Sequence, residues 1–395
     1  MPLGIYISVP FCRTKCSYCN FASDVFSRAV FERYVDRVCD DIENAPQAAA
    51  EMGGKTEFAI DSIYLGGGTP TVLEAAQLAR IFDAVRRQFE INSQAEITVE
   101  CAPGTLNDAV LESLLRCGVN RVSLGVQSFV DQEAAAVGRL HNRATVLADI
   151  TKLRAAGITN VNIDLIAGLP HQTSKSWELS VDETIATGAP HVSVYMLEVD
   201  EDSRLGRELL AGGTRYHAHF VPDEEATADF YLAACDRLRS AGIAQYEISN
   251  FARKGFESRH NLKYWTRQPY FGIGVDAHSM LPSVTADKDA VRFAHSDSLE
   301  KYMSGAPLQR SMVSRTAALE ESFFLGLRLS RGINLPELSA KFGGQAIENL
   351  RPVIAELVDG GLLEQAADMV WLTPRGRLLS NEVFERFILA DEVIR

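Results

Sequence analysis

Short apolar runs rich in β-branched residues alternate with amphipathic segments along the first 245 residues. Apolar positions in the amphipathic segments recur with the 3.6-residue period of a helix, and Gly118, Gly157 and Gly188 stand where such helices would end. The apolar runs predict six strands, at residues 4–11, 62–68, 96–104, 121–129, 160–170 and 191–199. Repeated strand–helix units imply a parallel sheet with right-handed crossovers. The predicted fold class is therefore α/β, and a partial (β/α)6 barrel is favoured over an open, doubly wound sheet.

The pattern changes after residue 245. Residues 246–295 are rich in aromatic residues, Gly, Asn and His and lack a long amphipathic period, which favours structured loops over a site. Helical patterns return from residue 296, and a hairpin-like stretch precedes a final helix. We expect three parts: a barrel at 1–245, a lid or connection at 246–295, and a small, mainly helical, winged-helix-like domain at 296–395.

Composition narrows the class of partner. The chain is 46% hydrophobic and 23% charged, as an ordinary globular protein is. Its net charge of −13 argues against nucleic acid or an anionic membrane held by bulk electrostatics. No apolar run approaches the roughly 20 residues that span a bilayer, and the first residues lack the features of a signal peptide. We expect a cytoplasmic protein with no nucleic-acid partner and no integral membrane segment.

Three of the seven cysteines, Cys12, Cys16 and Cys19, fall within eight positions directly after the first predicted strand. Reduced cytoplasmic thiols favour metal over a disulfide. Structural zinc usually takes four ligands as two spaced pairs, and no second pair follows. An iron–sulfur cluster fits better, because a [4Fe–4S] cube held by three thiolates leaves one iron open for a small chelating molecule. We therefore predict that these three cysteines bind a [4Fe–4S] cluster whose fourth ligand is not protein.

The C-x3-C-x2-C spacing, with Tyr18 just before the last cysteine, resembles the signature of radical S-adenosylmethionine (SAM) proteins. The resemblance implies a partial barrel of the radical SAM type. It also implies that the amino and carboxylate groups of SAM chelate the open iron, and that one electron from the cluster cleaves the sulfonium.

Further unusual residues fall where the predicted strands end or shortly after them. "LGGGTPT" at 65–71, Glu100 and Gln127 follow this rule, "AVGRLHN" supplies Arg139, and Asp164 interrupts an apolar strand. Taken singly, the glycines suit a tight turn, Glu100 suits a cap or solvent, and a buried Asp164 needs a partner or a ligand. Their order resembles the oxygen-independent coproporphyrinogen oxidase family of radical SAM proteins over almost the whole chain. The resemblance implies SAM contacts by Tyr6, Gly67, Gly68, Thr69, Glu100, Gln127, Arg139 and Asp164.

That family has two branches, and two features of this sequence distinguish between them. In the dehydrogenase branch, the resemblance implies a further cysteine two positions after the third cluster cysteine, and an N-terminal extension. Here that position is Phe21, and 11 residues precede Cys12. "HNLKYW" at 260–265 matches the H-N-x-x-Y-W motif of the heme chaperone branch. Both features favour the chaperone branch.

The histidine and aromatic residues of "HNLKYW" suit a porphyrin. His260 can ligate heme iron, and Tyr264 and Trp265 offer flat apolar surface. The alternatives are a hydrogen-bonded loop histidine, packing of the two aromatic rings, and His278 as a rival ligand. We predict a heme chaperone with a [4Fe–4S] cluster and exchangeable SAM, which passes heme to an acceptor such as a respiratory heme protein. The alternatives are a coproporphyrinogen III dehydrogenase and a radical enzyme on an unrelated substrate.

Overall fold

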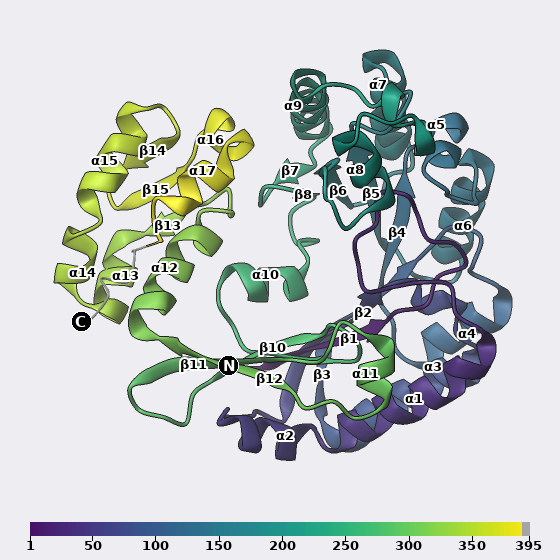
Figure 1. Ribbon diagram of the computed structural model, residues 1–395, viewed down its shortest axis with the longest axis horizontal. Coiled ribbons are helices and arrows are strands. Elements are labelled where there is room, and N and C mark those ends of the chain that lie inside the picture. Colours follow the sequence, from purple (N-terminus) through teal and green to yellow (C-terminus); the bar gives the residue numbers. More distant parts are fainter. Residues whose placement is uncertain (389–395) are drawn as a thin grey trace.

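The computed structural model describes residues 1–388, and a mixed sheet of 12 strands forms its centre (Figure 1). The six predicted strands are confirmed and run parallel and in sequence order through the middle of this sheet. Their bounds are β1 (Leu3–Val9), β2 (Ala59–Gly67), β3 (Glu90–Cys101), β4 (Arg121–Gln127), β5 (Asn160–Ala167) and β6 (His191–Met196). The carboxyl ends of all six strands therefore lie along one edge of the sheet, which is where parallel α/β folds place their functional sites.

Helices connect the parallel strands and cover the outer face of the curved sheet (Figure 1). They are α1 (Arg28–Glu43), α2 (Ala45–Met52), α3 (Ala75–Gln88), α4 (Asp108–Arg116), α5 (Asp131–Ala136), α6 (Arg143–Ala155) and α7 (Ser174–Ala186), with a short 3-10 turn η1 (Pro70–Val72). After β6 come α8 (Arg204–Leu210), which contacts the cysteine loop, a second 3-10 turn η2 (Arg215–Phe220), and α9 (Glu224–Ser240). Gly118, Gly157 and Gly188 adopt φ of 82°, 90° and 67° just after α4, α6 and α7. These left-handed conformations end the helices as predicted.

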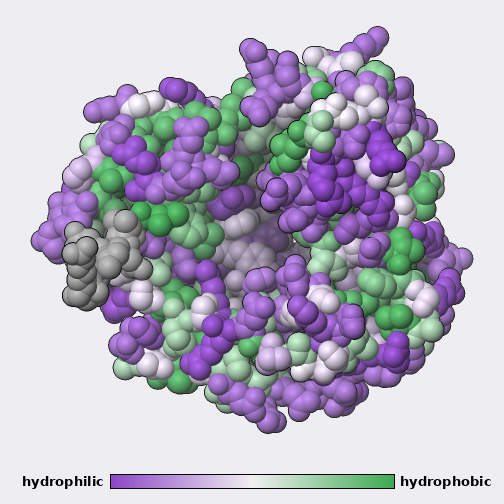
Figure 2. Space-filling view, viewed as in Figure 1, coloured by the Kyte–Doolittle hydropathy of each residue, from purple (hydrophilic) through white to green (hydrophobic). Residues whose placement is uncertain are grey.

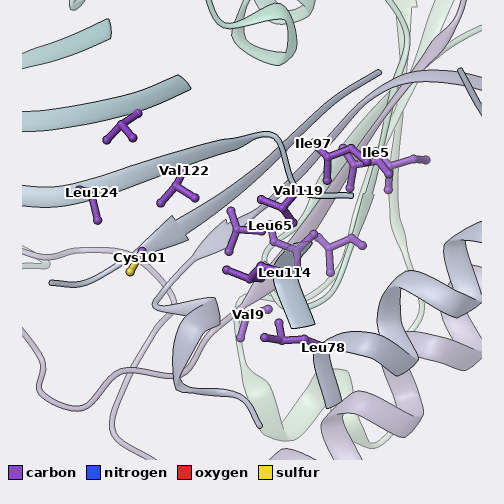
Figure 3. Packing of buried hydrophobic residues seen from close by; sticks show 14 of the residues in the cluster. Ile5, Val9, Leu65, Leu78, Ile97, Cys101, Leu114, Val119, Val122 and Leu124 are labelled. Carbon is purple, nitrogen blue, oxygen red and sulfur yellow. The ribbon is translucent and has the colours of Figure 1, made fainter. Parts of the chain in front are cut away.

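The core lies between the sheet and this helical layer (Figure 3). Leu65 of β2, Leu78 of α3 and Leu114 of α4 are fully buried there. Figure 3 shows them beside apolar residues of β1, β3 and β4. Because both faces of a parallel strand are covered, the strands read as nearly continuous apolar runs. This packing holds the strand ends rigid beneath the site.

Residues 246–294 differ from the structured loops that the sequence predicts, because the sheet continues through them at both edges. After the short strand β7 (Ala244–Gln245), a helix and strands form instead: β8 (Asn250–Ala252), α10 (Arg259–Trp265), β9 (Tyr270–Ile273), β10 (His278–Pro282) and β11 (Lys288–Ala294). β9 pairs in parallel with β1, and β8 pairs antiparallel with β6. The strands are short, so their period-2 pattern is too brief to recognise in the sequence.

The chain then leaves the sheet and forms a mainly helical C-terminal domain, with the β14–β15 hairpin that the sequence predicts. Its elements are α11 (Leu299–Met303), β12 (Gln309–Ser314), α12 (Arg315–Gly326), β13 (Ile333–Asn334), α13 (Leu335–Phe342), α14 (Gly344–Glu348), α15 (Arg351–Asp359), β14 (Leu363–Ala366), β15 (Met369–Leu372), α16 (Pro374–Leu378) and α17 (Ser380–Glu385). β12 still belongs to the large sheet. The domain has a separate apolar core and a three-stranded sheet of its own. The three-part division with borders at 245 and 295 stays a prediction.

Tyr34 ties the first strand to the segment after β9. Its buried hydroxyl donates to the carbonyl oxygen of Ser8 at 2.8 Å and accepts from the N–H of Val275 at 3.1 Å. We expect Tyr34→Phe to lower the free energy of unfolding by about 1–3 kcal/mol, because two buried backbone groups lose their partner. Denaturant unfolding measures this, with Tyr216→Phe at an exposed tyrosine as the control. Equal losses in both variants would contradict this role of Tyr34.

No helix within residues 1–388 combines the length and the apolar character that crossing a bilayer requires.

Candidate functional site

The three clustered cysteines lie on the loop that follows β1. Hydrogen bonds from Cys12 N–H to the Asp24 carbonyl oxygen, at 3.0 Å, and from Asp24 N–H to the Pro10 carbonyl oxygen, at 3.0 Å, close the base of this loop. Inside it, the Lys15 ammonium donates to the carbonyl oxygens of Phe21 and Ser23, at 2.7 and 2.5 Å. A loop with few apolar residues is thereby held in one shape by its own polar groups.

The thiols of Cys12, Cys16 and Cys19 are free and face one cavity. Within the described part of the chain, no three His, Cys, Asp or Glu side chains converge on a point as the ligands of a single metal ion would. A [4Fe–4S] cube suits thiols that do not converge, because each thiolate binds a different iron. Arg139 Nη1 lies 3.6 Å from Cys16 Sγ, and Thr69 Oγ1 lies 3.8 Å from Cys12 Sγ. Both side chains can donate to sulfur atoms of a bound cluster, so the residues present fit an iron–sulfur cluster.

The cavity has a volume of about 1030 Å³ and opens on the face shown in Figure 2, between the barrel and the C-terminal domain. Residues from the ends of the parallel strands and from the cysteine loop line one side of it. Every predicted SAM-contacting residue is among its lining residues: Tyr6, Gly67, Gly68, Thr69, Glu100, Gln127, Arg139 and Asp164. The structure therefore brings these residues together around the three cysteines, although their individual roles stay predictions.

The glycines after β2 allow the strand to approach its neighbours. A Cβ on Gly68 would lie 2.6 Å from the Val9 carbonyl oxygen and 2.9 Å from that of Phe11. A Cβ on Gly67, which has a φ of 92°, would lie 2.8 Å from Ser8 Oγ. The N–H of Thr69 donates to the Phe11 carbonyl oxygen at 2.8 Å. The absence of side chains here brings the β2 backbone against the residues that lead into the cysteine loop.

Glu100, near the end of β3, carries the carboxylate nearest to this glycine motif. It accepts hydrogen bonds from the Tyr64 hydroxyl at 2.9 Å and from the N–H of Gly67 at 3.2 Å. Burial, followed by the negative charge of Asp164, raises the pKa of Glu100 from 4.5 to about 7. Two donors already orient the side chain, and either oxygen can still accept from a ligand hydroxyl.

The raised pKa of Glu100 predicts a pH dependence of stability. Between 4.5 and about 7 the folded chain binds more protons than the unfolded chain, so stability falls as pH rises through this window. Glu100→Gln removes the titration, so its Tm relative to the unmodified protein should rise by about 2–4 °C from about pH 5 to about pH 8. Thermal unfolding at both pH values measures this, with exposed Glu57→Gln as the control. Parallel curves for all three proteins would contradict the assignment.

Gln127, Arg139 and Asp164 complete the side of the cavity that the strands form. Gln127 ends β4 with a φ of 70°, a strained conformation for a residue with a side chain. Arg139 donates to the Gly125 carbonyl oxygen, and its buried Nε has no partner within the described residues. Asp164 accepts from Asn162 at 2.7 Å and from Ser123 at 3.1 Å, and burial raises its pKa. The predicted need of Asp164 for a partner is therefore met by protein groups, while it also faces the cavity.

His260 lies in helix α10 and does not line the cavity. Its Nδ1 is 3.0 Å from Ser62 Oγ, and its Nε2 is 2.9 Å from the Tyr264 hydroxyl. Burial lowers the pKa of His260 to about 3, so the ring is neutral. The N–H groups of Arg259 and His260 both donate to Glu96 of β3. This geometry favours the alternative of a hydrogen-bonded structural histidine, and the axial role of His260 stays a prediction.

Several lining residues have no signal in the sequence. His141 follows Arg139 and binds the Val126 carbonyl oxygen through Nε2 at 3.1 Å. A Cβ on Gly125 would lie 3.0 Å from Arg139 Nη2, so this glycine makes room for the guanidinium. Residues of the C-terminal domain line the far side: Arg328, Arg375, Arg377, Leu378, Leu379, Ser380 and Asn381. Of these residues, Gly125 alone carries a sequence signal, because a glycine inside an apolar strand often indicates the close approach of another group.

Comparisons with known proteins agree with this arrangement. Residues 6–183 match the radical SAM superfamily model, and residues 313–379 match the HemN C-terminal domain model. The structure of coproporphyrinogen III oxidase (HemN) from Escherichia coli, described as a radical SAM enzyme, has a TM-score of 0.82 to this chain. The match covers 98% of this chain and 90% of that one at 23% identity, which establishes the shared fold alone.

Two relatives match along almost their whole length. The heme chaperone HemW of Lactococcus lactis subsp. lactis (strain IL1403) is 32% identical over 397 residues, which cover 99% of this chain and 98% of the relative. The heme chaperone HemW of Bacillus subtilis (strain 168) is 35% identical over 387 residues, which cover 97% and 98%. With the cysteine loop, the glycine motif and the partial barrel in place, this chain belongs to the HemW family of radical SAM proteins.

Proposed function

We propose that this protein binds heme and passes it to an acceptor protein, such as a respiratory heme protein. In the proposal, Cys12, Cys16 and Cys19 hold a [4Fe–4S] cluster, and SAM occupies the strand ends beside it. The two relatives with the near full-length matches are both named heme chaperones, which supports heme as the cargo.

The size and continuity of the cavity carry the proposal. Its volume of about 1030 Å³ lies at the upper end of the roughly 300–1,000 Å³ that ligand pockets usually have. Its lining runs from the cysteine loop past apolar side chains such as Tyr195, Ile248 and Leu378 to the C-terminal domain. A flat macrocycle beside bound SAM would be buried on these apolar residues.

Different residues of the site serve SAM and the iron–sulfur cluster. Glu100 is oriented by Tyr64 and Gly67 and can accept from the ribose hydroxyls of SAM. Arg139 donates to the sulfur of Cys16, and the glycine motif lets backbone groups reach the ligand. When bound, the cluster supplies the electron that cleaves the sulfonium of SAM. In the proposed chaperone, this cleavage is not productive, and the binding of SAM regulates heme transfer instead.

Phe21 argues against the dehydrogenase alternative. This exposed side chain lines the cavity at the position where the dehydrogenase pattern has a further cysteine. A phenyl ring can cover a porphyrin but can neither ligate iron nor carry a proton.

Anaerobic turnover distinguishes the two functions. The full-length protein is reconstituted with iron and sulfide, reduced, and supplied with SAM and coproporphyrinogen III. The proposal expects no accumulation of decarboxylated porphyrinogen, while heme added to the same preparation is bound. Decarboxylated product at catalytic yield would assign the chain to the dehydrogenase function.

A further inference from the structure

The C-terminal domain presents positive charge to the cavity at the side away from the strand ends. Arg328 follows α12, and Arg375 and Arg377 lie in α16. All three line the cavity. The strand and cysteine-loop side carries charges of both signs, since basic side chains there accompany Glu100 and Asp164. The charged residues that the C-terminal domain adds to the lining are all arginines, so an acidic group is well accommodated there.

Arg375 and Arg377 keep most of their donors free. Arg375 Nη1 donates to the Gly360 carbonyl oxygen at 3.2 Å, and Arg377 Nη1 donates to the Leu372 carbonyl oxygen at 3.2 Å. Within residues 1–388, neither guanidinium forms an ion pair with an Asp or Glu. An arginine has five N–H donors, so each side chain is anchored at one nitrogen and can offer a fork to a carboxylate.

The sequence around α16 explains this placement. Thr373 caps the helix by accepting from the N–H of Gly376 at 2.8 Å, and Pro374 occupies its first turn. A Cβ on Gly376 would collide with the Leu362 carbonyl oxygen, so only glycine lets the helix pack here. The stretch "TPRGR" therefore fixes the backbone of both arginines against the hairpin.

Arg328 is held from the barrel side. Its guanidinium lies 4.3 Å from the ring centre of Trp265, and its Nη2 is 3.8 Å from Glu247 Oε2. Its buried Nε has no partner within the described residues. Trp265 is the last residue of "HNLKYW", so that motif supports an arginine of the cavity through a cation–π contact.

We propose that Arg328, Arg375 and Arg377 bind the propionate carboxylates of the porphyrin. The macrocycle then lies along the apolar residues between these arginines and the cysteine loop. This inference rests on the proposed heme binding and adds the chemistry that orients the cargo. Bidentate pairing of guanidinium with carboxylate is the geometry that arginine favours.

The test compares the full-length protein with Arg375→Gln/Arg377→Gln, and uses Arg351→Gln/Arg386→Gln as a control. The control removes the same charge from exposed positions of the same domain outside the cavity. Each protein is titrated with iron protoporphyrin IX and with its dimethyl ester. The unmodified protein and the control should bind the free acid at least about tenfold more tightly than the ester. The cavity variant should lose that preference and keep its affinity for the ester.

The outcomes separate this inference from the proposed function. A cavity variant that keeps the full preference for the free acid would overturn the arginine assignment. Equal binding of acid and ester by the unmodified protein would also overturn it, while leaving heme binding in place. An unmodified protein that binds neither porphyrin would overturn both proposals.

Discussion

Cys16→Ala is expected to abolish the iron–sulfur cluster. Cys16 is buried and accepts a hydrogen bond from Arg139 Nη1, so its thiolate is fixed at the wall of the cavity. Two remaining protein thiolates rarely hold a [4Fe–4S] cube. After anaerobic reconstitution, the variant should retain less than about a tenth of the iron and sulfide of the unmodified protein.

Cys39→Ala is the control for this loss. Cys39 lies in α1, which follows the cysteine loop, but it does not line the large cavity, and its thiol is likewise free. It should retain the full iron and sulfide content. An unchanged cluster absorbance in Cys16→Ala would contradict the ligand assignment.

Gly68→Ala is expected to have the second largest effect, on both stability and SAM binding. The new Cβ would lie within 3.0 Å of backbone atoms of Val9 and Phe11, which cannot move away as a flexible side chain would. Overpacking of this kind costs about 1–3 kcal/mol. The shift also displaces the entry to the cysteine loop, so SAM affinity, measured by anaerobic calorimetry, should fall at least about tenfold.

Gly344→Ala provides the matched control, because the nearest atom to its Cβ would be the Ser339 hydroxyl oxygen at 3.6 Å. Its stability and SAM affinity should stay within error of the unmodified protein. If Gly68→Ala bound SAM normally, the close contact between β2 and the cysteine loop would have no part in the site.

The barrel could be predicted from the sequence because each of its strands and helices has a recognisable pattern of apolar positions within its own residues. Buried parallel strands are continuous apolar runs, and the helices between them are long enough to show their period. The sequence does not predict strand β9, because its parallel partner β1 is remote along the chain. Gly4 of β1 pairs with Tyr270, more than 260 residues later, and no local pattern records such a pairing.

The strand side of the site could be predicted for a related reason. The cysteine spacing and the polar residues at strand ends can be recognised in the sequence. The parallel topology then places these residues at the same edge of the sheet. The C-terminal side could not be predicted, since Arg328, Arg375 and Arg377 resemble any surface arginines until the fold places them on the cavity. His260 is the opposite case, in which the sequence suggests a role that the structure does not favour. Its residue type suggests a heme ligand, whereas burial and two hydrogen bonds favour a structural role.

Titration of heme into the anaerobically reconstituted, full-length protein decides whether the cavity binds heme. Absorbance of the bound heme, recorded with and without SAM, gives the stoichiometry and the affinity. We expect saturation at about one heme per chain, because one ligand fills one cavity. Absorbance that rises without saturation, as for heme bound at scattered surface positions, would contradict it.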